Sequence, residues 1–482
     1  MKPIGQILKD SFYYIPSNIV PALCGLFSLT IFTRLLAPEH FAQYILALTT
    51  VTFAANIGFS WLNYSGFRYL NEFKNNLPQF YSTSIISLLI LLIIFSVLGC
   101  LCASILNGYF KLKNTSLMIL LSIPLLITKI IFDQLLLLIR AEGRAKTHSL
   151  IRSVDAVAKI SFAVLLISFF NMGYEGVIYG MATSFAILAI YEMHNLHVWR
   201  NVRLGYFSIP MLKKFIRYGL PLMGLGLTGT ILSVSDRYMV SYFCSEMDLG
   251  LYGAGYRLAE MVIDTPSAIL LMAYVPVLIR VFNESGEKGA SELLSNIFKL
   301  LVLILIPAVT GAILLSKDIV AILLDTRYSN AHILFFWICT ATFLVCVNHL
   351  YTRVFELKNA TPKILSISFI AAALNIIMNL ILLPKYGYIG AAISTLLAYL
   401  IQVSLSYYEA RKLMEIRIPL KSLLNAVIGS VVMYLAVTWL SGYLGAPVWW
   451  AFIAKVTVGI LVYLAALYML KESILVQCYS NV

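Results

Sequence analysis

Charged side chains inside long apolar segments are the residues of this sequence best suited to chemistry. Arg257, Glu260 and Asp264 are spaced three and four apart, so in a helix they share one face. A charge at the bilayer centre costs roughly 2.5 to 3.5 kcal/mol on insertion scales. The three side chains together would cost on the order of 8 to 10 kcal/mol against lipid. We therefore expect this face to line a polar cavity and to bind a ligand.

Three further charged pairs lie within, or at the ends of, apolar segments. They are Lys129 with Asp133, Asp155 with Lys159, and Asp236 with Arg237. The first two pairs have the i, i+4 spacing at which opposite charges neutralise each other on a helix. Two interpretations stay open for those two pairs, a helix-packing ion pair or the lining of a polar cavity.

The elements that position these residues are apolar runs of about twenty residues or more, the length that crosses roughly 30 Å of hydrocarbon. The 482-residue sequence is 60% hydrophobic and 12% charged, against about 45–50% and roughly 25% in soluble domains. We predict an all-α integral membrane protein with about fourteen transmembrane helices. The expected spans are residues 12–36, 41–63, 82–107, 115–139, 153–171, 176–199, 218–241, 250–279, 293–316, 331–352, 364–383, 388–410, 422–441 and 448–470.

The basic residues predict an orientation rather than a nucleic-acid partner. Lys and Arg number 35 against 22 Asp and Glu, a net charge of +13. About 23 of the 35 fall in the loops on the side of the N-terminus, and only a few fall in the opposite loops. Because basic loops stay in the cytoplasm, we expect both termini to be cytoplasmic and no nucleic acid to bind.

Two loop patterns recur at nearly one offset. Residues 34–44 resemble residues 236–252, and the Gly-Tyr-Glu-Gly of 173–176 resembles the Gly-Tyr-Ile-Gly of 387–390. Each unit of six spans enters the membrane in the same direction, which predicts two parallel lobes. The expected division is an N-lobe at 1–205, a C-lobe at 206–415, and two additional helices within 416–482.

Patterns typical of enzymes and cofactor sites find no support. Gly224 to Gly229 match the dinucleotide fingerprint G-x-G-x-x-G, but they lie within a predicted span, where we interpret them as close helix packing. His194 and His197, with Glu192 near them, lack a fourth ligand for zinc. The seven cysteines show no C-x-x-C spacing. We expect no metal, no cofactor and no catalytic residue.

Three stretches resemble a known family: Thr30 to Ala47, Ser233 to Glu260, and Asn375 to Ile401. They are similar to the polysaccharide-transporter branch of the multidrug/oligosaccharidyl-lipid/polysaccharide exporter superfamily, which includes O-antigen flippases of the Wzx type. The resemblance covers nearly the whole chain. It implies two helical lobes around a central cavity, alternating access, and an undecaprenyl-pyrophosphate-linked oligosaccharide as substrate.

The resemblance also implies roles for the charged residues. Cations of the leading helices would bind the pyrophosphate and glycan, and acids would couple transport to H⁺ or Na⁺. The implied binding residues are Arg237, Arg257, Arg34, Lys129 and Lys159, and the implied coupling residues are Glu260, Asp264, Asp236, Asp133 and Asp155. The position that corresponds to Arg257 in the first lobe falls near Thr49, which is uncharged. The implied setting is the bacterial inner membrane, with membrane lipids, a polysaccharide polymerase and a chain-length regulator as partners.

Two other functions compete with a flippase. A multidrug antiporter of the same superfamily would need acidic and aromatic residues without excess cations in its cavity, and the four cations within spans argue against it. A membrane-embedded glycan polymerase or acyltransferase would need a nucleophile with a base, or a carboxylate cluster at an outer loop. The predicted outer loops are short and carry neither.

Overall fold

The protein is built almost entirely of helices in the parts that the structure describes. The computed structural model describes residues 16–70, 72–105, 115–443 and 448–472, and these contain no strand. Thirteen helices among the described residues are long and apolar enough to cross a membrane. Helices suit this role because their backbone hydrogen bonds are made internally, where no water is available. The predicted all-α membrane architecture is confirmed.

Large apolar side chains are exposed along whole helix faces. On helix α4 (Leu77–Ile105) they include Ile90, Ile93, Ile94, Val97, Leu101 and Ile105. A soluble protein rarely exposes so continuous an apolar surface. This stripe is the surface expected to face hydrocarbon.

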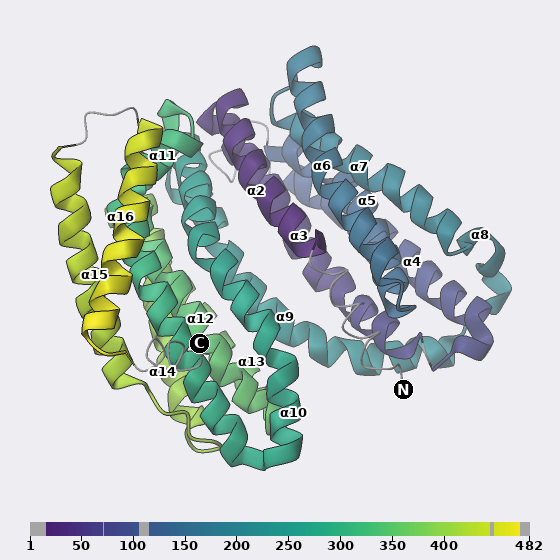
Figure 1. Ribbon diagram of the computed structural model, residues 1–482. Coiled ribbons are helices and arrows are strands. Elements are labelled where there is room, and N and C mark those ends of the chain that lie inside the picture. The colour runs from purple at the N-terminus through teal and green to yellow at the C-terminus, as the bar shows by residue number, and fades with distance from the viewer. Residues whose placement is uncertain (1–15, 71, 106–114, 444–447, 473–482) are drawn as a thin grey trace. The chain divides into compact units, whose positions relative to one another are not determined.

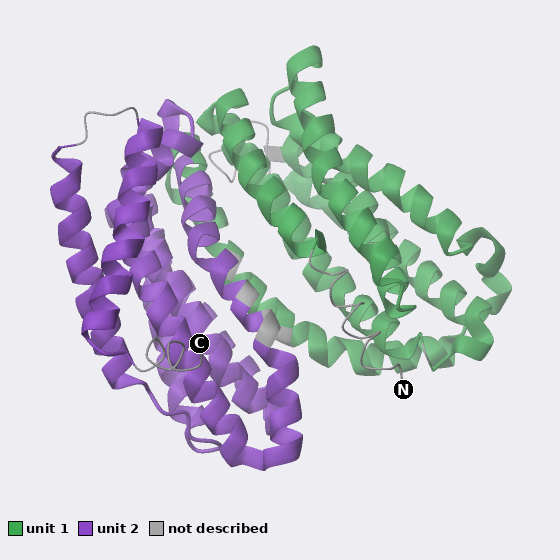
Figure 2. Ribbon diagram, viewed as in Figure 1, with its two compact units in different colours: residues 1–250 green, residues 251–482 purple. Residues whose placement is uncertain are grey.

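The chain divides into two compact units, residues 1–250 and residues 251–482 (Figure 2). The regular elements of unit 1 in its described residues are all helices (Figure 1). They are α2 (Pro16–Leu35), α3 (Pro38–Tyr69), η1 (Lys74–Asn76), α4 (Leu77–Ile105), α5 (Thr115–Ala141), α6 (Ala145–Phe170), α7 (Tyr174–Asn195), α8 (Val198–Asn201), η2 (Leu204–Tyr206) and α9 (Ile209–Phe243).

Within unit 1, α9 packs along α3, and α7 packs on both α5 and α6. A Cβ on Gly219 of α9 would lie 2.1 Å from the Trp61 carbonyl oxygen of α3. One turn earlier, the buried Ser65 hydroxyl of α3 donates to the Phe215 carbonyl oxygen of α9 at 2.7 Å. Small residues of this kind let two helices approach closely in a membrane. The pair α3 and α9 therefore forms a tightly packed part of unit 1.

Unit 2 begins within the long helix α10 (Glu246–Leu314). Its remaining elements are α11 (Ser316–Leu323), η3 (Thr326–Leu334), α12 (Phe335–Leu357), α13 (Thr361–Tyr386), α14 (Tyr388–Ala410), α15 (Leu420–Ser441) and α16 (Val448–Met469). Helix α14 packs on α12 and α13, and α15 packs on α16. The Tyr463 hydroxyl of α16 donates to the Leu303 carbonyl oxygen of α10 at 2.7 Å, so these two helices are also in contact.

Helix α10 holds two of the predicted spans, 250–279 and 293–316, in one element. It begins with a capping box, because the Asp248 N–H donates to Ser245 Oγ at 3.1 Å and the Ser245 N–H donates to Asp248 at 3.2 Å. Gly286, at φ 65° and ψ −155°, interrupts the helical backbone between the two spans. Glycine adopts this conformation without steric cost. The expected loop between the two spans is therefore a kink.

The two predicted repeat signatures form the same local structure. Gly173 precedes the first residue of α7, and Gly387 precedes that of α14. A Cβ on Gly390 would lie 2.5 Å from the Leu382 carbonyl oxygen, and one on Gly176 would lie 3.0 Å from an isoleucine side chain. Each signature thus closes a tight turn between two helices that pack together, α6 with α7 and α13 with α14.

The glycine motif of α9 differs from its prediction. It lies inside a helix, as expected, but close packing through all its glycines is wrong. A Cβ on Gly224 or Gly229 would have no heavy atom of a described neighbour within 4 Å, and one on Gly226 would lie 3.4 Å from the Tyr64 hydroxyl. The close contact of α9 with α3 instead involves Gly219, two turns before Gly226, because the Cβ there faces the α3 backbone.

Candidate functional site

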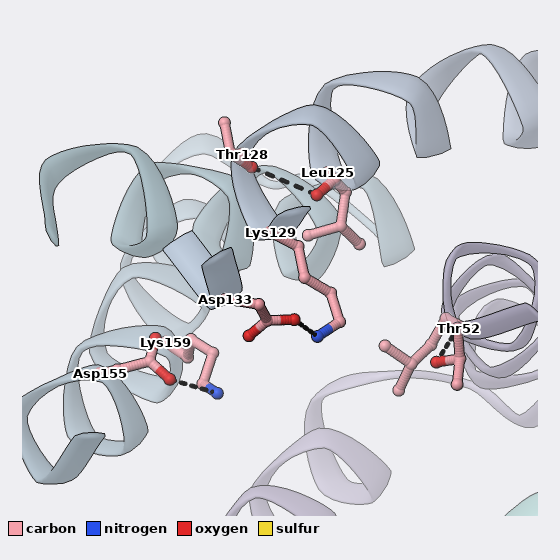
Figure 3. Close-up of polar contacts among 8 residues, drawn as sticks. Thr52, Leu125, Thr128, Lys129, Asp133, Asp155 and Lys159 are labelled. Carbon is pink, nitrogen blue, oxygen red and sulfur yellow. Dashed lines mark hydrogen bonds and ion pairs between the residues drawn. The ribbon is translucent and has the colours of Figure 1, made fainter. Parts of the chain in front are cut away.

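The charged residues of α5 and α6 form two ion pairs in unit 1 (Figure 3). Lys129 pairs with Asp133 along α5, and Lys159 Nζ lies 2.7 Å from Asp155 Oδ2 along α6. Each lysine pairs with the aspartate of its own helix because helical residues four apart lie one above the other. The Asp155 side chain is only 7% exposed, whereas the other three are between 24% and 35% exposed.

Helix α7 connects the two pairs. Phe185 lies beneath both ammonium groups, with Lys129 Nζ 5.8 Å and Lys159 Nζ 5.1 Å from its ring centroid. The buried Ser184 hydroxyl donates to Asp155 Oδ1 at 3.1 Å. Both ammonium groups are therefore close to the same aromatic ring, and cation–π attraction adds to each ion pair. The sequence predicted the pairs but not these contacts with α7.

Arg237 and Asp236 lie on α9, where α9 meets α3. Arg237 Nη1 donates to Thr49 Oγ1 at 3.2 Å, and the next residue, Tyr238, donates its hydroxyl to Thr50 Oγ1 at 3.0 Å. Asp236 is buried, and its Oδ1 accepts the Arg237 backbone N–H at 2.8 Å. Thr49, the uncharged position that the repeat relates to Arg257, is thus a contact of Arg237.

Arg34 stands at the last turn of α2, with an exposed side chain. It follows Thr33, which is buried and donates its hydroxyl to the Leu29 carbonyl oxygen at 2.9 Å. Its place at the end of a helix fits a cation, because the helix dipole is negative there. A role in substrate binding remains a prediction for this residue.

In unit 2, Arg257 and Glu260 pair on one face of α10. Arg257 Nη1 lies 2.8 Å from Glu260 Oε2, and the side chains are 52% and 31% exposed. Asp264 is exposed one turn further along, as the spacing predicted. The face therefore carries a cation held by one acid and a second acid beside them. In the predicted span 250–279, such exposed charges would be stable only toward water or protein.

Glu192 is the charged residue of unit 1 that sequence reasoning missed. It lies in the last turn of α7, is fully buried, and neither carboxylate oxygen has a hydrogen-bond partner in the described part of the chain. Asp133 and Asp155 are close enough to act on it electrostatically. Its only sequence signal was its neighbourhood to His194 and His197, which pointed to a metal rather than to α5 and α6.

Curated relatives of this chain are described as flippases. It is 24% identical over 268 residues to "Probable flippase AglR" of Haloferax volcanii, with 54% of each chain covered. It is 20% identical over 205 residues to "Probable low-salt glycan biosynthesis flippase Agl15" of the same organism, covering 42% of this chain and 43% of that one. The chain thus spans about half the length of the curated relatives that it matches.

Solved structures show the same fold at low sequence identity. "Lipid II flippase MurJ, inward closed conformation" matches with a TM-score of 0.79 and 16% identity, over 96% of this chain and 99% of that chain. An inward-facing multidrug resistance MATE family transporter of the MOP superfamily matches with a TM-score of 0.68 and 14% identity, over 82% and 94%. At these identities the likeness establishes the fold alone.

The family itself follows from a match that covers more than half of the sequence. The family model for polysaccharide biosynthesis proteins matches residues 7–282, a range that contains every predicted site residue. The match agrees with the flippase relatives and with the fold shared with exporters of this superfamily. The chain belongs to the polysaccharide biosynthesis protein family.

Proposed function

We propose that this protein is a flippase that moves a lipid-linked oligosaccharide across a membrane by alternating access. Family membership is the observation that carries the proposal, and the names of both Haloferax relatives support it. The substrate is an undecaprenyl-pyrophosphate-linked repeat unit of a surface polysaccharide such as O-antigen. It crosses the bacterial inner membrane, both termini of the protein are cytoplasmic, and a polymerase and a chain-length regulator act on the product.

The exposed cation of α10 supports an anionic substrate. A pyrophosphate needs fixed positive charge when it leaves water, and a guanidinium can bond two phosphate oxygens at once. Arg257 is 52% exposed although Glu260 holds one of its nitrogens. In this proposal, Glu260 orients the Arg257 side chain, and the remaining guanidinium N–H groups of Arg257 bind the substrate. Arg237, Arg34, Lys129 and Lys159 are proposed to contact other parts of the substrate.

Ion coupling is proposed for the acids beside these cations. Glu260 and Asp264 are the first candidates, because a carboxylate that exchanges a proton or Na⁺ changes the charge of the face that meets the substrate. Asp236, Asp133 and Asp155 are proposed to support the same coupling. Transport that stays normal under every ion gradient in both the E260Q and D264N variants would contradict the role of the first two.

The experiment uses purified protein in liposomes that contain a fluorescent polyprenyl-pyrophosphate-linked sugar, with flipping followed by chemical quenching of the outer leaflet. A charge-assisted hydrogen bond contributes about 1.5 to 3 kcal/mol. Arg257→Ala should therefore slow flipping roughly ten- to hundredfold. Arg257→Lys should keep the pair with Glu260 but lose the bidentate fork, so we expect a smaller but clear loss.

Arg280→Ala provides the control, because Arg280 is an exposed arginine on the same helix at its predicted cytoplasmic side. This variant should flip as the wild type does. Wild-type flipping by a well-folded Arg257→Ala protein would show that this cation does not hold the substrate. If the wild type transports a fluorescent amphipathic cation and not the lipid-linked sugar, the flippase proposal is wrong and the antiporter is favoured.

A further inference from the structure

We propose that Glu192 is a proton-binding site in unit 1, a buried carboxyl that keeps its proton beside the ion pairs of Lys129 and Lys159. Together with Asp133 and Asp155 these residues make up what we call the α5–α7 charge cluster. Proton binding itself follows from the geometry of unit 1. Its coupling to transport rests on the proposed flippase function.

The first argument is the burial of Glu192 without a partner. Its side chain is fully buried, and both oxygens lack a hydrogen bond in the described structure. An ionised carboxylate in that state bears a large desolvation penalty that nothing offsets. A protonated carboxyl avoids most of this penalty because it is neutral.

The second argument is the charge that surrounds it. From α5 come Lys129 and Asp133, and from α6 come Asp155 and Lys159. The two acids, which act on Glu192 electrostatically, already hold the two lysines. The four charges sum to zero, so an ionised Glu192 would leave one uncompensated negative charge in the cluster. Protonation keeps the cluster neutral.

The other basic groups of α5 and α6 make no hydrogen bond to Glu192: Arg140 and Arg152 have exposed side chains, and His148 is buried on α6. The other elements that meet α7 bring no partner for it either. Helix α3 contacts α7 at its opposite end, where His40 stacks on Tyr174 at 6.2 Å between ring centroids. Helix α8 brings Arg200, whose side chain is exposed. Arg144, just before α6, donates to the Asn195 carbonyl oxygen at 3.5 Å and so is engaged at the end of α7.

The consequence is a change of charge among buried groups. With its proton, Glu192 leaves Lys129 with Asp133 and Lys159 with Asp155, as observed. Without the proton, the cluster carries one additional negative charge, which Asp133 and Asp155 oppose. Binding or release of the proton therefore changes the charge among α5, α6 and α7, and such a change can bias a conformational equilibrium.

Infrared spectroscopy of the full-length protein in lipid nanodiscs tests proton binding directly. We expect a carboxylic-acid C=O band at neutral pH that is lost in Glu192→Gln and that disappears when the pH of the wild type is raised. Glu175→Gln is the matched control, because Glu175 lies at the other end of α7 and is partly exposed. The Glu175→Gln protein should show the same carboxylic-acid band as the wild type. A band that persists in full in Glu192→Gln would overturn the proposal.

Glu192→Asp keeps the proposal testable if the glutamine variant does not fold. It preserves a carboxyl at this place, so the band should shift in frequency, and an unshifted band would overturn the proposal. Coupling is tested in the liposome assay with an imposed pH gradient, where Glu192→Gln should lose the gradient dependence that Glu175→Gln retains. Unaltered gradient dependence in Glu192→Gln would refute coupling, whereas absence of flipping by the wild type would refute only the proposed function.

Discussion

The pair of Asp155 and Lys159 gives a quantitative test of whether the α5–α7 charge cluster behaves as one unit. The perturbation is a double-mutant cycle with Asp155→Asn, Lys159→Met and the double variant. Asp155 is 7% exposed and Lys159 28% exposed, with 2.7 Å between Oδ2 and Nζ. Asparagine keeps an acceptor for the Ser184 hydroxyl, which donates to Asp155 at 3.1 Å. The single change therefore removes charge and little else.

The size of the effect follows from burial. Breaking a fully buried ion pair costs about 3 to 5 kcal/mol, and an exposed pair contributes about 0.2 to 1 kcal/mol. Because Lys159 is partly exposed, we expect Asp155→Asn to lower the free energy of unfolding by about 2 kcal/mol. The double variant should recover much of this loss, with a coupling energy of about 1 to 2 kcal/mol.

Glu192 adds a consequence that a simple pair would not have. Asp155→Asn leaves the cluster with one extra positive charge, which an ionised Glu192 can neutralise. The infrared acid band assigned to Glu192 should therefore weaken in Asp155→Asn and return in the double variant. This compensation also means that the loss of stability stays below that of an isolated buried lysine.

Unfolding by SDS in mixed micelles, followed by tryptophan fluorescence, measures the cycle. The pair of Lys214 and Glu72 is the control, because both side chains are more than 40% exposed, and its coupling energy should be below about 1 kcal/mol. A coupling energy for Asp155 and Lys159 no larger than that of this exposed pair would refute the reasoning. An unchanged acid band in Asp155→Asn would refute the link to Glu192.

Two further predictions concern the end of α16 and the orientation of the chain. Burial raises the pKa of Glu472, but hydrogen bonds from Asn425, Lys299 and Ser422 outweigh burial and hold that pKa below its ordinary value. These contacts should therefore be complete at any pH above the ordinary pKa of a glutamate. They should be lost as the pH falls through the lowered pKa of Glu472. Glu472→Gln should remove this pH dependence, which hydrogen exchange in the last turn of α16 measures. In a cysteine-free background, Gly205→Cys should react with an impermeant reagent only from the cytoplasm and Ser329→Cys only from outside; the reverse pattern would show that the orientation is wrong.

Much of the fold was predictable because a membrane imposes a length on its helices. Apolar runs of about twenty residues mark the spans, and the structure has helices at each of them within the described residues. Thirteen described segments qualify as candidate spans, and the part of α10 before Tyr274 is not among them. The boundary between spans 250–279 and 293–316 was less predictable. The residues between them are polar and charged, which predicts a loop, but polar residues also continue a helix outside the hydrocarbon, and only Gly286 departs from helical geometry.

The division into lobes is a different case. The repeated loop patterns place a boundary at 205, whereas the compact units divide after Gly250, because α9 packs along α3 within unit 1. Contacts such as the one between Gly219 and the Trp61 carbonyl oxygen are made by residues far apart in sequence. A repeat describes how the chain is organised, and it does not fix which helices pack most closely. The two lobes stay a prediction.

The candidate site shows the same limit at the level of side chains. Spacing within one helix predicted that Lys129 would meet Asp133, and that Asp155 would meet Lys159, because i, i+4 geometry is local. Phe185 and Ser184 could not be predicted in this way, since their contacts depend on how α7 is rotated against α5 and α6. Neither residue carries a charge that would mark it as unusual in an apolar span.

The role of Glu192 was missed, although the sequence contains the information needed to predict it. Glu192 lies near the end of a predicted span, where an acid is ordinarily solvated at the membrane surface. The charge bias, however, assigns the ends of α5 and α7 and the start of α6 to the same side of the membrane. Asp133, Asp155 and Glu192 all lie in the half of their helix nearest those termini, and the same three predicted spans carry two lysines. The uneven count of acids and bases is itself the signal, because a buried cluster favours neutrality, and the proton on Glu192 is the simplest way to reach it.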